Sequence, residues 1–292
     1  MEQEHDLTQG SLVRTVVVFA IPFLLANLIQ AFYGAADLMV VGWYCGRDAV
    51  AAVSTGTQVT QIITSMITGL TLGSTVLVGN YTGQKRPEEV KKIIGTSFCL
   101  FAGAGMVLSV LLFLFCPWIL TALQTPEESY ELAGQYVQVC ACGVVFICGY
   151  NAISAVLRGC GDSKSPLLFV AVAGCMNVVG DIFLVKYFHM GVRGTAFATI
   201  FSQGFSMVCA ALYLNKRNFI FQFRLKNFRM DRGKAGELIK VGIPISFQEC
   251  MVRLSFLYLT SVTNALGVAA SSAVGIAGKY DVFAMLPATS AA

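Results

Sequence analysis

Four polar side chains inside long apolar segments have the chemical types that bind a small cation. They are two carboxylates, one amide and one hydroxyl, contributed by Asp37, Asn177, Asp181 and Thr199. Hard oxygen donors of this kind suit a small hard cation, or a proton shared between two acids. If the segments cross a membrane, such groups are costly unless they meet partners or a water-filled cavity, which makes them functional candidates.

The spacing of polar residues around Asp37 predicts one polar face on a helix. Asn27, Gln30, Gly34 and Asp37 follow one another at steps of three or four residues, and residues so spaced share a helical face. Pro22 precedes this face and permits a bend, because proline removes one backbone hydrogen bond. The alternative is a kinked packing helix in which Asp37 reaches a loop.

The other three candidates follow the same spacing rule. Asn177 and Asp181 lie four residues apart, as do Thr199 and Gln203, so each pair shares a helical face. A structural ion pair between Asp181 and Lys186 is the alternative for the first pair. Thr199 alone would be satisfied by its own helix backbone, so its neighbours decide whether it matters.

Composition predicts where these residues lie. Of 292 residues, 56% are hydrophobic and 12% are charged, and the mean hydropathy is +0.69. These values exclude a disordered chain and argue against a soluble enzyme. Both His residues lie outside the apolar runs, and the ten Cys residues form no C-x-x-C pair. We therefore expect neither a His-based metal site nor a disulfide framework.

Apolar runs of about 20 residues or more predict an all-α, polytopic membrane protein. The sequence contains seven complete runs and part of an eighth, at 15–45, 49–80, 93–123, 131–157, 165–188, 191–215, 235–264 and 268–292. The loops on one side carry most of the Lys and Arg residues, whereas the other side has only Arg47, Lys186 and Arg193. The positive-inside rule then places the N-terminus in the cytoplasm.

An internal repeat predicts two lobes. Residues 15–56 resemble 237–278, and Ile21-Pro22 matches Ile243-Pro244. A unit of about 222 residues holds six spans, so the second copy enters in the same orientation, as a parallel repeat. We expect twelve helices in a full form and interpret the chain as truncated in its second lobe. The predicted parts are a cytoplasmic N-terminus (1–14), a complete first lobe (15–215), a basic linker (216–234) and an incomplete second lobe (235–292). We expect the basic linker to contact lipid rather than nucleic acid.

Further polar residues leave alternatives open. Asn151 and Arg158 lie seven apart on one face of the fourth span, and Glu249 and Arg253 are spaced for a buried ion pair. The run Gly159-Cys160-Gly161-Asp162 has the G-x-G-D pattern of intramembrane aspartyl proteases, in which two Asp residues activate water. Here Asp162 sits at a span end in a polar turn, which argues against that chemistry.

These features together resemble the multidrug and toxic compound extrusion (MATE) family. The resemblance is carried by Pro22 with Asp37 and Gly42, by the run Arg158 to Asp162 with Pro166, by Asn177-x-x-x-Asp181, and by Thr199 after Gly194. It implies twelve helices in two lobes and the export of cationic, often aromatic compounds in exchange for H⁺ or Na⁺. It also implies a bacterial cytoplasmic membrane location, a monomer when full length, and no enzymatic activity.

The resemblance assigns roles to individual residues. In a bacterial branch related to DinF proteins, Asp37, Asn177, Asp181 and Thr199 would form the cation site, and Pro22 would be the hinge of helix 1. We expect Gln30, Tyr33 and Asn151 to line the substrate cavity. Na⁺ or H⁺ is the expected coupling ion, with no cofactor or other metal.

One departure from the family pattern favours coupling in the first lobe. Other branches place a cation-binding Glu about eight residues after the proline of helix 7, where this sequence has Val252. Glu249 lies one turn earlier, and the sequence assigns no role to it or to Asp281. The alternative function, a lipid-linked oligosaccharide flippase, would need positive charge for pyrophosphate, and the acids in these spans argue against it.

Overall fold

The computed structural model describes residues 12–123, 125–216, 221 and 227–265, and the regular structure within these ranges is helical with no strand. Each long helix covers a predicted apolar run, because a membrane span must satisfy its backbone hydrogen bonds internally. The helices are α1 (Leu12–Tyr44), α2 (Arg47–Gly83), α3 (Pro87–Ala122), α4 (Glu127–Gly159), α5 (Lys164–Asp181), the π-helix η1 (Ile182–Tyr187), α6 (Gly191–Lys216) and α7 (Arg232–Ala265).

Six of the described helices are long and apolar enough to cross a membrane: α1 to α4, α5 continued by η1, and α6. The predicted span 235–264 does form a helix, α7. It is not among the six, because polar groups such as Gln248, Glu249 and Arg253 dilute its apolar stretch. The predicted eighth span, 268–292, lies outside the described residues.

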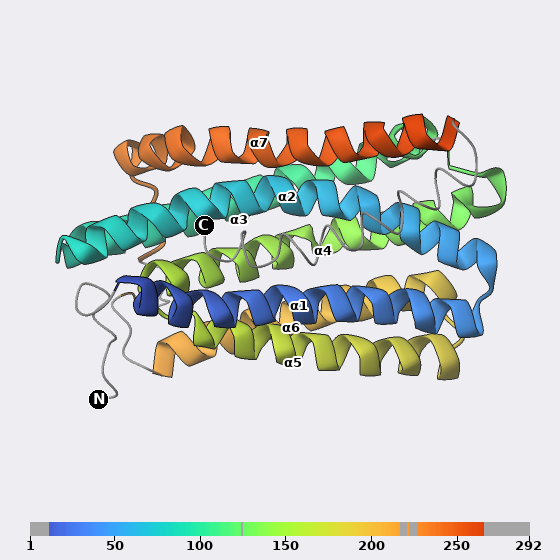
Figure 1. The fold of residues 1–292 in the computed structure, drawn as a ribbon, viewed down its shortest axis with the longest axis horizontal. Helices are drawn as coiled ribbons and strands as arrows, with labels where there is room; N and C mark the ends of the chain where they lie inside the picture. The colour runs from blue at the N-terminus through green and yellow to red at the C-terminus, as the bar shows by residue number, and fades with distance from the viewer. Residues whose placement is uncertain (1–11, 124, 217–220, 222–226, 266–292) are drawn as a thin grey trace.

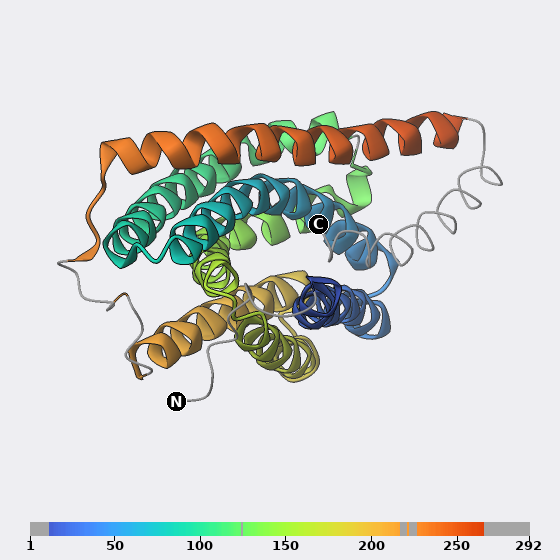
Figure 2. The same ribbon diagram turned by 60° about the vertical axis from the view of Figure 1, so that its left-hand side comes forward.

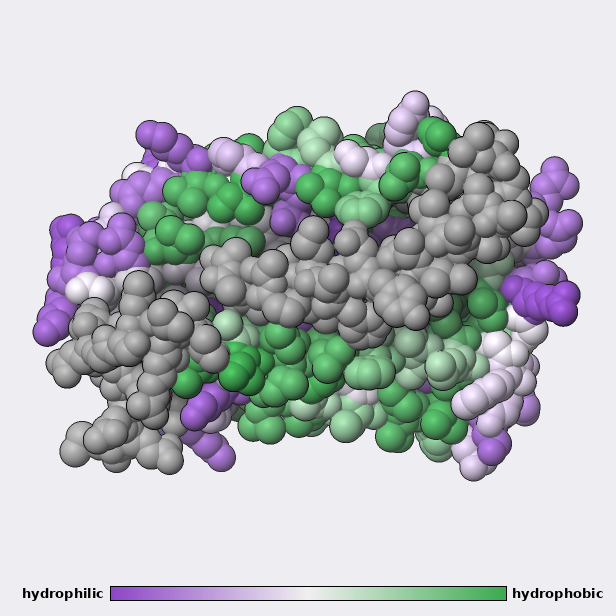
Figure 3. All heavy atoms as spheres, in the orientation of Figure 1, coloured by the Kyte–Doolittle hydropathy of each residue, from purple (hydrophilic) through white to green (hydrophobic). Residues whose placement is uncertain are grey.

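The surface has the pattern of a protein immersed in lipid. Large apolar side chains stand exposed on it, Trp118 at 71% and Leu114 at 65%. In Figure 3 a hydrophobic band lies between two hydrophilic ends of the molecule. Apolar surface of this extent is not stable against water, so the band marks the part that contacts acyl chains.

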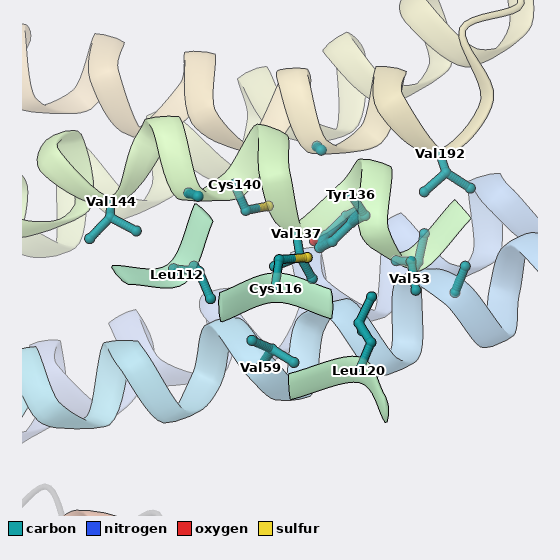
Figure 4. Packing of buried hydrophobic residues seen from close by; sticks show 14 of the residues in the cluster. Val53, Val59, Leu112, Cys116, Leu120, Tyr136, Val137, Cys140, Val144 and Val192 are labelled. Carbon is teal, nitrogen blue, oxygen red and sulfur yellow. The ribbon is translucent and has the colours of Figure 1, made fainter. Parts of the chain in front are cut away.

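Helix α4 forms the centre of the lobe. It packs against α2, α3 and α6, while α5 packs against α6 and α1; Figure 2 shows α4 between these two groups of helices. The main core cluster joins α2, α3 and α4 through side chains such as Val59, Cys116 and Tyr136 (Figure 4). All ten Cys residues are free, and Cys116, Cys140 and Cys148 pack in the main core cluster as small apolar side chains.

The first helices of the two predicted repeats run in the same direction. In Figure 1, α1 and α7 both begin at the same end of the lobe and lie parallel. Each is a continuous helix with an interior proline, Pro22 in α1 and Pro244 in α7. The parallel orientation agrees with a repeat of six spans.

Helix α7 approaches α2 along a line of small residues. A Cβ added at Gly69 would collide with the backbone of Ser246, and one at Gly73 would come within 2.9 Å of Gly242 Cα. The hydroxyl of Ser246 donates to the carbonyl of Met66 at 2.9 Å. Small residues allow two backbones this close, and such packing is a main source of helix association in membranes.

A charged cluster joins α7 to α2 and α3 at the end where α7 begins. Lys234 Nζ lies 2.9 Å from Glu89 Oε2 and 3.0 Å from Glu237 Oε1, and it donates to Tyr81 OH at 2.7 Å. Burial alone would lower the pKa of Lys234, but the hydrogen bonds to Tyr81 and the two carboxylates raise it above its ordinary value. The ammonium therefore stays charged at physiological pH and links the three helices.

The close approach at Gly69 predicts opposite effects for two Gly→Ala substitutions. Ala at Gly103, where a Cβ meets nothing within 4 Å, should be neutral or should stabilise α3 by up to about 1 kcal/mol, because Gly is a poor helix former. Ala at Gly69 should instead destabilise by about 1–3 kcal/mol, because the Ser246 backbone must move. Thermal unfolding of the purified variants in detergent tests this, and equal midpoints would contradict the packing.

Candidate cation site

Three helices bring the four cation-site candidates together inside the lobe. Asp37 comes from α1, Asn177 and Asp181 from α5, and Thr199 from α6. Asp37 is 7% exposed, and Asn177 and Asp181 are 0% exposed. The Asp37 carboxyl group lies close enough to the other three side chains to interact with each. Residues 140 positions and more apart in sequence thus form one cluster.

Local helix geometry places these groups on facing surfaces. The four-residue spacing of Asn177 and Asp181 puts both on one face of α5, which packs between α1 and α6. Asn177 Nδ2 donates to Thr199 Oγ1 at 3.3 Å, and Thr199 Oγ1 donates to the Thr195 carbonyl at 3.0 Å. Thr199 therefore bonds its own helix, as a lone Thr would, and also contacts the cluster through Asn177.

Four carboxylate and amide oxygens of the cluster lack hydrogen-bond donors. Among the described residues, no donor reaches Asp37 Oδ1, Asn177 Oδ1 or either carboxylate oxygen of Asp181, although all four atoms are buried. A buried polar atom without a partner is costly, and a buried charge without a partner costs much more. A proton or a small cation would supply the positive charge that these oxygens lack.

Neither structural alternative for the two acids fits this geometry. Lys186 makes no ion pair with Asp181; its ammonium lies 5.9 Å from the ring centre of Tyr44 and 5.5 Å from that of Tyr187. Asp37 does not reach a loop, since it is buried between helices. Among the described residues no group of three or more His, Cys, Asp or Glu side chains gathers, so the cluster has only two acidic ligands, and its other donors are neutral.

The structure adds two features that the sequence analysis missed. The hydroxyl of Thr195 is fully buried and has no partner among the described residues, one turn before Thr199. The sequence could have predicted this position, because Thr195 lies four residues before Thr199 and eight before Gln203, on the same helical face. The helix carrying Asp181 also changes to the π-helix η1 immediately after that residue. Single π turns within helices occur mostly at functional sites, because they interrupt the regular backbone bonding.

The predicted substrate-cavity residues lie in two places. Tyr33 interacts with Gln30 on its own helix, and its hydroxyl accepts a hydrogen bond from Gln203 Nε2 of α6 at 3.3 Å. Asn151 lies on α4, where its amide donates to the carbonyl of Ile147 in the preceding turn at 2.8 Å. The structure thus brings Gln30 and Tyr33 together, and among the described residues neither forms a hydrogen bond with Asn151.

Two other candidates from the sequence have structural partners. Asp162 accepts hydrogen bonds from the backbone N–H and the hydroxyl of Ser165, at 3.0 and 2.6 Å, so it organises the polar turn before α5. The expected ion pair between Glu249 and Arg253 does not form within the described residues. Arg253 Nε donates to Ser65 Oγ on α2 at 3.2 Å instead.

The family model described as MatE matches residues 22–183, more than half of the chain. The chain belongs to the MATE family. The matched region contains Asp37, Asn177 and Asp181, while Thr199 lies beyond it. The predicted family and the all-helical membrane fold are both confirmed.

Relatives of this MATE chain extend the match over nearly its whole length. It is 30% identical over 288 residues to the probable multidrug resistance protein YpnP of Bacillus subtilis strain 168. The aligned region covers 98% of the chain and 64% of that protein. A MOP superfamily transporter from Pyrococcus furiosus superimposes with a TM-score of 0.91 at 22% identity, covering 100% of the chain and 64% of that protein.

A second solved structure, of MATE in the bent conformation, gives a TM-score of 0.91 at 22% identity and covers 100% of the chain and 65% of that protein. At this identity the two structures show the common fold alone. The chain spans less than two thirds of the length of each of these three proteins.

The unpartnered oxygens predict that the MATE chain is stabilised by whichever cation occupies the cluster. Either Na⁺ or acidification should raise the unfolding temperature, since a ligand that binds only the folded state stabilises it, by about 2.7 kcal/mol at 100 times its dissociation constant. Asp37→Asn should remove this response, because the amide carries no charge. Thermal unfolding with Na⁺ replaced by choline at constant ionic strength, and across a pH series, measures it.

Asp48→Asn is the matched control, because Asp48 is an exposed carboxylate in the first turn of α2. That variant should respond as the wild type does. A wild-type chain insensitive to both Na⁺ and pH, or an Asp37→Asn chain that still responds, would contradict the assignment.

Proposed function

We propose that this MATE chain provides the first lobe and the first helix of the second lobe of a cation-coupled antiporter that exports organic cations. The observation that carries the proposal is the set of buried oxygens without donors where α1, α5 and α6 meet. Intramembrane acids with no structural ion pair are the groups that ion-coupled transporters use. The probable multidrug resistance relative YpnP supports export of small molecules as the task.

The coupling step follows from electrostatics. With both carboxylates of Asp37 and Asp181 ionised, like charges face each other in a medium of low dielectric, which drives α1 away from α5. A proton or Na⁺ bound between them removes this repulsion and favours the packed arrangement described above. An ion couples to motion only if it binds two states unequally, and the separation of the two acids supplies that difference.

Helix α1 contains a proline at which it can bend. Pro22 lies inside it, about four turns before Asp37. Proline leaves one carbonyl without its backbone partner and lowers the cost of bending at that point. We propose that Pro22 is the hinge about which the segment carrying Asp37 moves when the ion leaves or binds.

We place the substrate beside the same helix. Gln30 and Tyr33 lie on α1 within two turns of Asp37, so a movement of α1 changes the cavity that they line together with Asn151. The phenol ring of Tyr33 can stack on an aromatic cation. A flippase for lipid-linked oligosaccharides is less well supported, because the buried charged groups of this site are acids.

The orientation belongs to the same proposal. The excess of Lys and Arg in the loops after α2, α4 and α6 places these loops and the N-terminus in the bacterial cytoplasm. The coupling ion would then enter from the opposite side, down its gradient, while the substrate leaves.

Export should depend on Asp37 and not on Asp48. In everted membrane vesicles that contain the gene product, a fluorescent cationic dye such as ethidium should accumulate when an ion gradient is imposed. Asp37→Asn should reduce the rate to the level of empty vesicles, because the variant cannot gain or lose the coupling charge. Asp48→Asn should transport at the wild-type rate, with equal membrane levels of both variants checked by immunoblot.

Imposing a proton gradient and a sodium gradient separately identifies the ion. Normal transport by Asp37→Asn under both gradients would overturn the proposal.

A further inference from the structure

A groove of about 380 Å³ lies on the outer surface of the lobe between α3, α4 and α6. No residue of α1, α5 or α7 lines it, so it is separate from the candidate cation site and from the contact with the second repeat. Three phenylalanines form its apolar part: Phe113 of α3, Phe146 of α4 and Phe197 of α6. All three are more than a third exposed, so the groove is open to whatever surrounds the lobe.

The groove is polar at one end and apolar along the rest. Gln135, Gln138 and Arg193 line it near the starts of α4 and α6. Phe146 lies about three turns further along α4 than Gln135, or about 16 Å deeper into the membrane. Arg193 and Gln135 therefore lie at the end of the groove nearest the starts of the two helices, Gln138 and Phe197 lie about one turn further along, and Phe146 lies at the depth of acyl chains. A phospholipid has the same order of polar and apolar parts.

Opposite charges flank the polar end and are joined through one amide. Arg193 Nε donates to Gln135 Oε1 at 3.1 Å, and Gln135 Nε2 donates to Glu131 Oε1 at 3.3 Å. Among the described residues Arg193 has no carboxylate partner, so the outer edge of its guanidinium is available. Arg193 lines the groove, and Glu131 lies outside its lining, one turn nearer the start of α4 than Gln135. Both side chains are exposed, so a cation at the rim of the groove has an anion beside it, held through Gln135.

We propose that this groove is a binding site for a zwitterionic phospholipid with an ethanolamine headgroup. The phosphate is held by the guanidinium of Arg193, whose planar donors match phosphate oxygens. The ammonium is held by Glu131, and one acyl chain lies among Phe113, Phe146 and Phe197. The inference does not depend on transport, and it would stand if the antiporter proposal failed.

The charges select this headgroup over two others. A lipid with a net negative headgroup would bring an uncompensated charge next to Glu131. A choline headgroup has the same charges as ethanolamine, but its quaternary nitrogen has no N–H to donate to the carboxylate. Charge-assisted hydrogen bonds are worth enough to change affinity by about tenfold.

Lipid retention measured by native mass spectrometry tests the site on the full 292-residue chain. Phosphatidylethanolamine, phosphatidylcholine and phosphatidylglycerol with identical acyl chains are added to the chain in detergent. We expect the ethanolamine lipid to bind about tenfold more tightly than the other two. Glu131→Gln should abolish the preference over choline, and Arg193→Gln should weaken binding of both.

Matched controls sit at the same end of the lobe outside the groove. Arg47→Gln and Glu128→Gln remove exposed charges and should leave the preference unchanged. Cys142→Trp fills the groove without touching a charge, since Cys142 lines it, and should reduce retention of all three lipids.

Three outcomes would overturn the proposal. The first is equal retention of the three lipids by the wild type. The second is a preference that survives both Glu131→Gln and Arg193→Gln. The third is a dimer of the chain whose formation is blocked by Cys142→Trp while lipid retention is unaffected, since a second copy would then be the occupant.

Discussion

Two carboxylates buried in an apolar helical lobe, with no basic group to neutralise them among the described residues, are the constraint around which this structure is organised. A soluble domain would leave such acids at the surface or pair them with basic groups. Holding ionised acids without partners inside a membrane lobe lowers the free energy of unfolding substantially. That cost falls when positive charge is bound between Asp37 and Asp181. In the proposed mechanism the packing of α1 against α5 depends on the charge state of this pair, whereas the contacts around α4 do not.

The proposed coupling divides the lobe into a fixed part and a charge-dependent part. Helices α2, α3 and α4 share the main apolar core, and α7 is attached to them by the close approach at Gly69 and by the Lys234 cluster. Helix α1 has fewer such constraints: it contains Pro22, and its described contacts lie mainly with α5, with fewer to α2, α6 and η1. The groove proposed for lipid is lined by α3, α4 and α6 and includes no residue of α1 or α5.

The sequence predicted the fold well because a membrane leaves few choices of structure. Apolar runs long enough to span a bilayer must be helices, and each described run is one. The four-residue spacing correctly placed Asn177 and Asp181 on one face. That Asp37 meets them follows from how α1 packs on α5, which spacing within one helix does not specify. The shared resemblance supplied that link, and the structure supplied the geometry.

The features that the sequence predicted wrongly or missed have physical explanations. Glu249 and Arg253 have the spacing of an ion pair, but Arg253 finds a hydroxyl on α2, because a neighbouring helix offers partners that the sequence of α7 does not show. Thr195 escaped notice because a Thr in a span is ordinarily satisfied by its backbone. The π-helix begins two residues after Gly180, but a single Gly within an apolar run does not by itself indicate a π turn.

The most direct test of the central claim is infrared difference spectroscopy of the carboxyl stretching bands during acidification and during Na⁺ addition. The account predicts a change in these bands on at least one of the two treatments, absent from both Asp37→Asn and Asp181→Asn and retained by Asp48→Asn. Spectra in which the wild type and both variants behave alike under acid and under Na⁺ would show that the buried pair binds neither ion, and the account would fail.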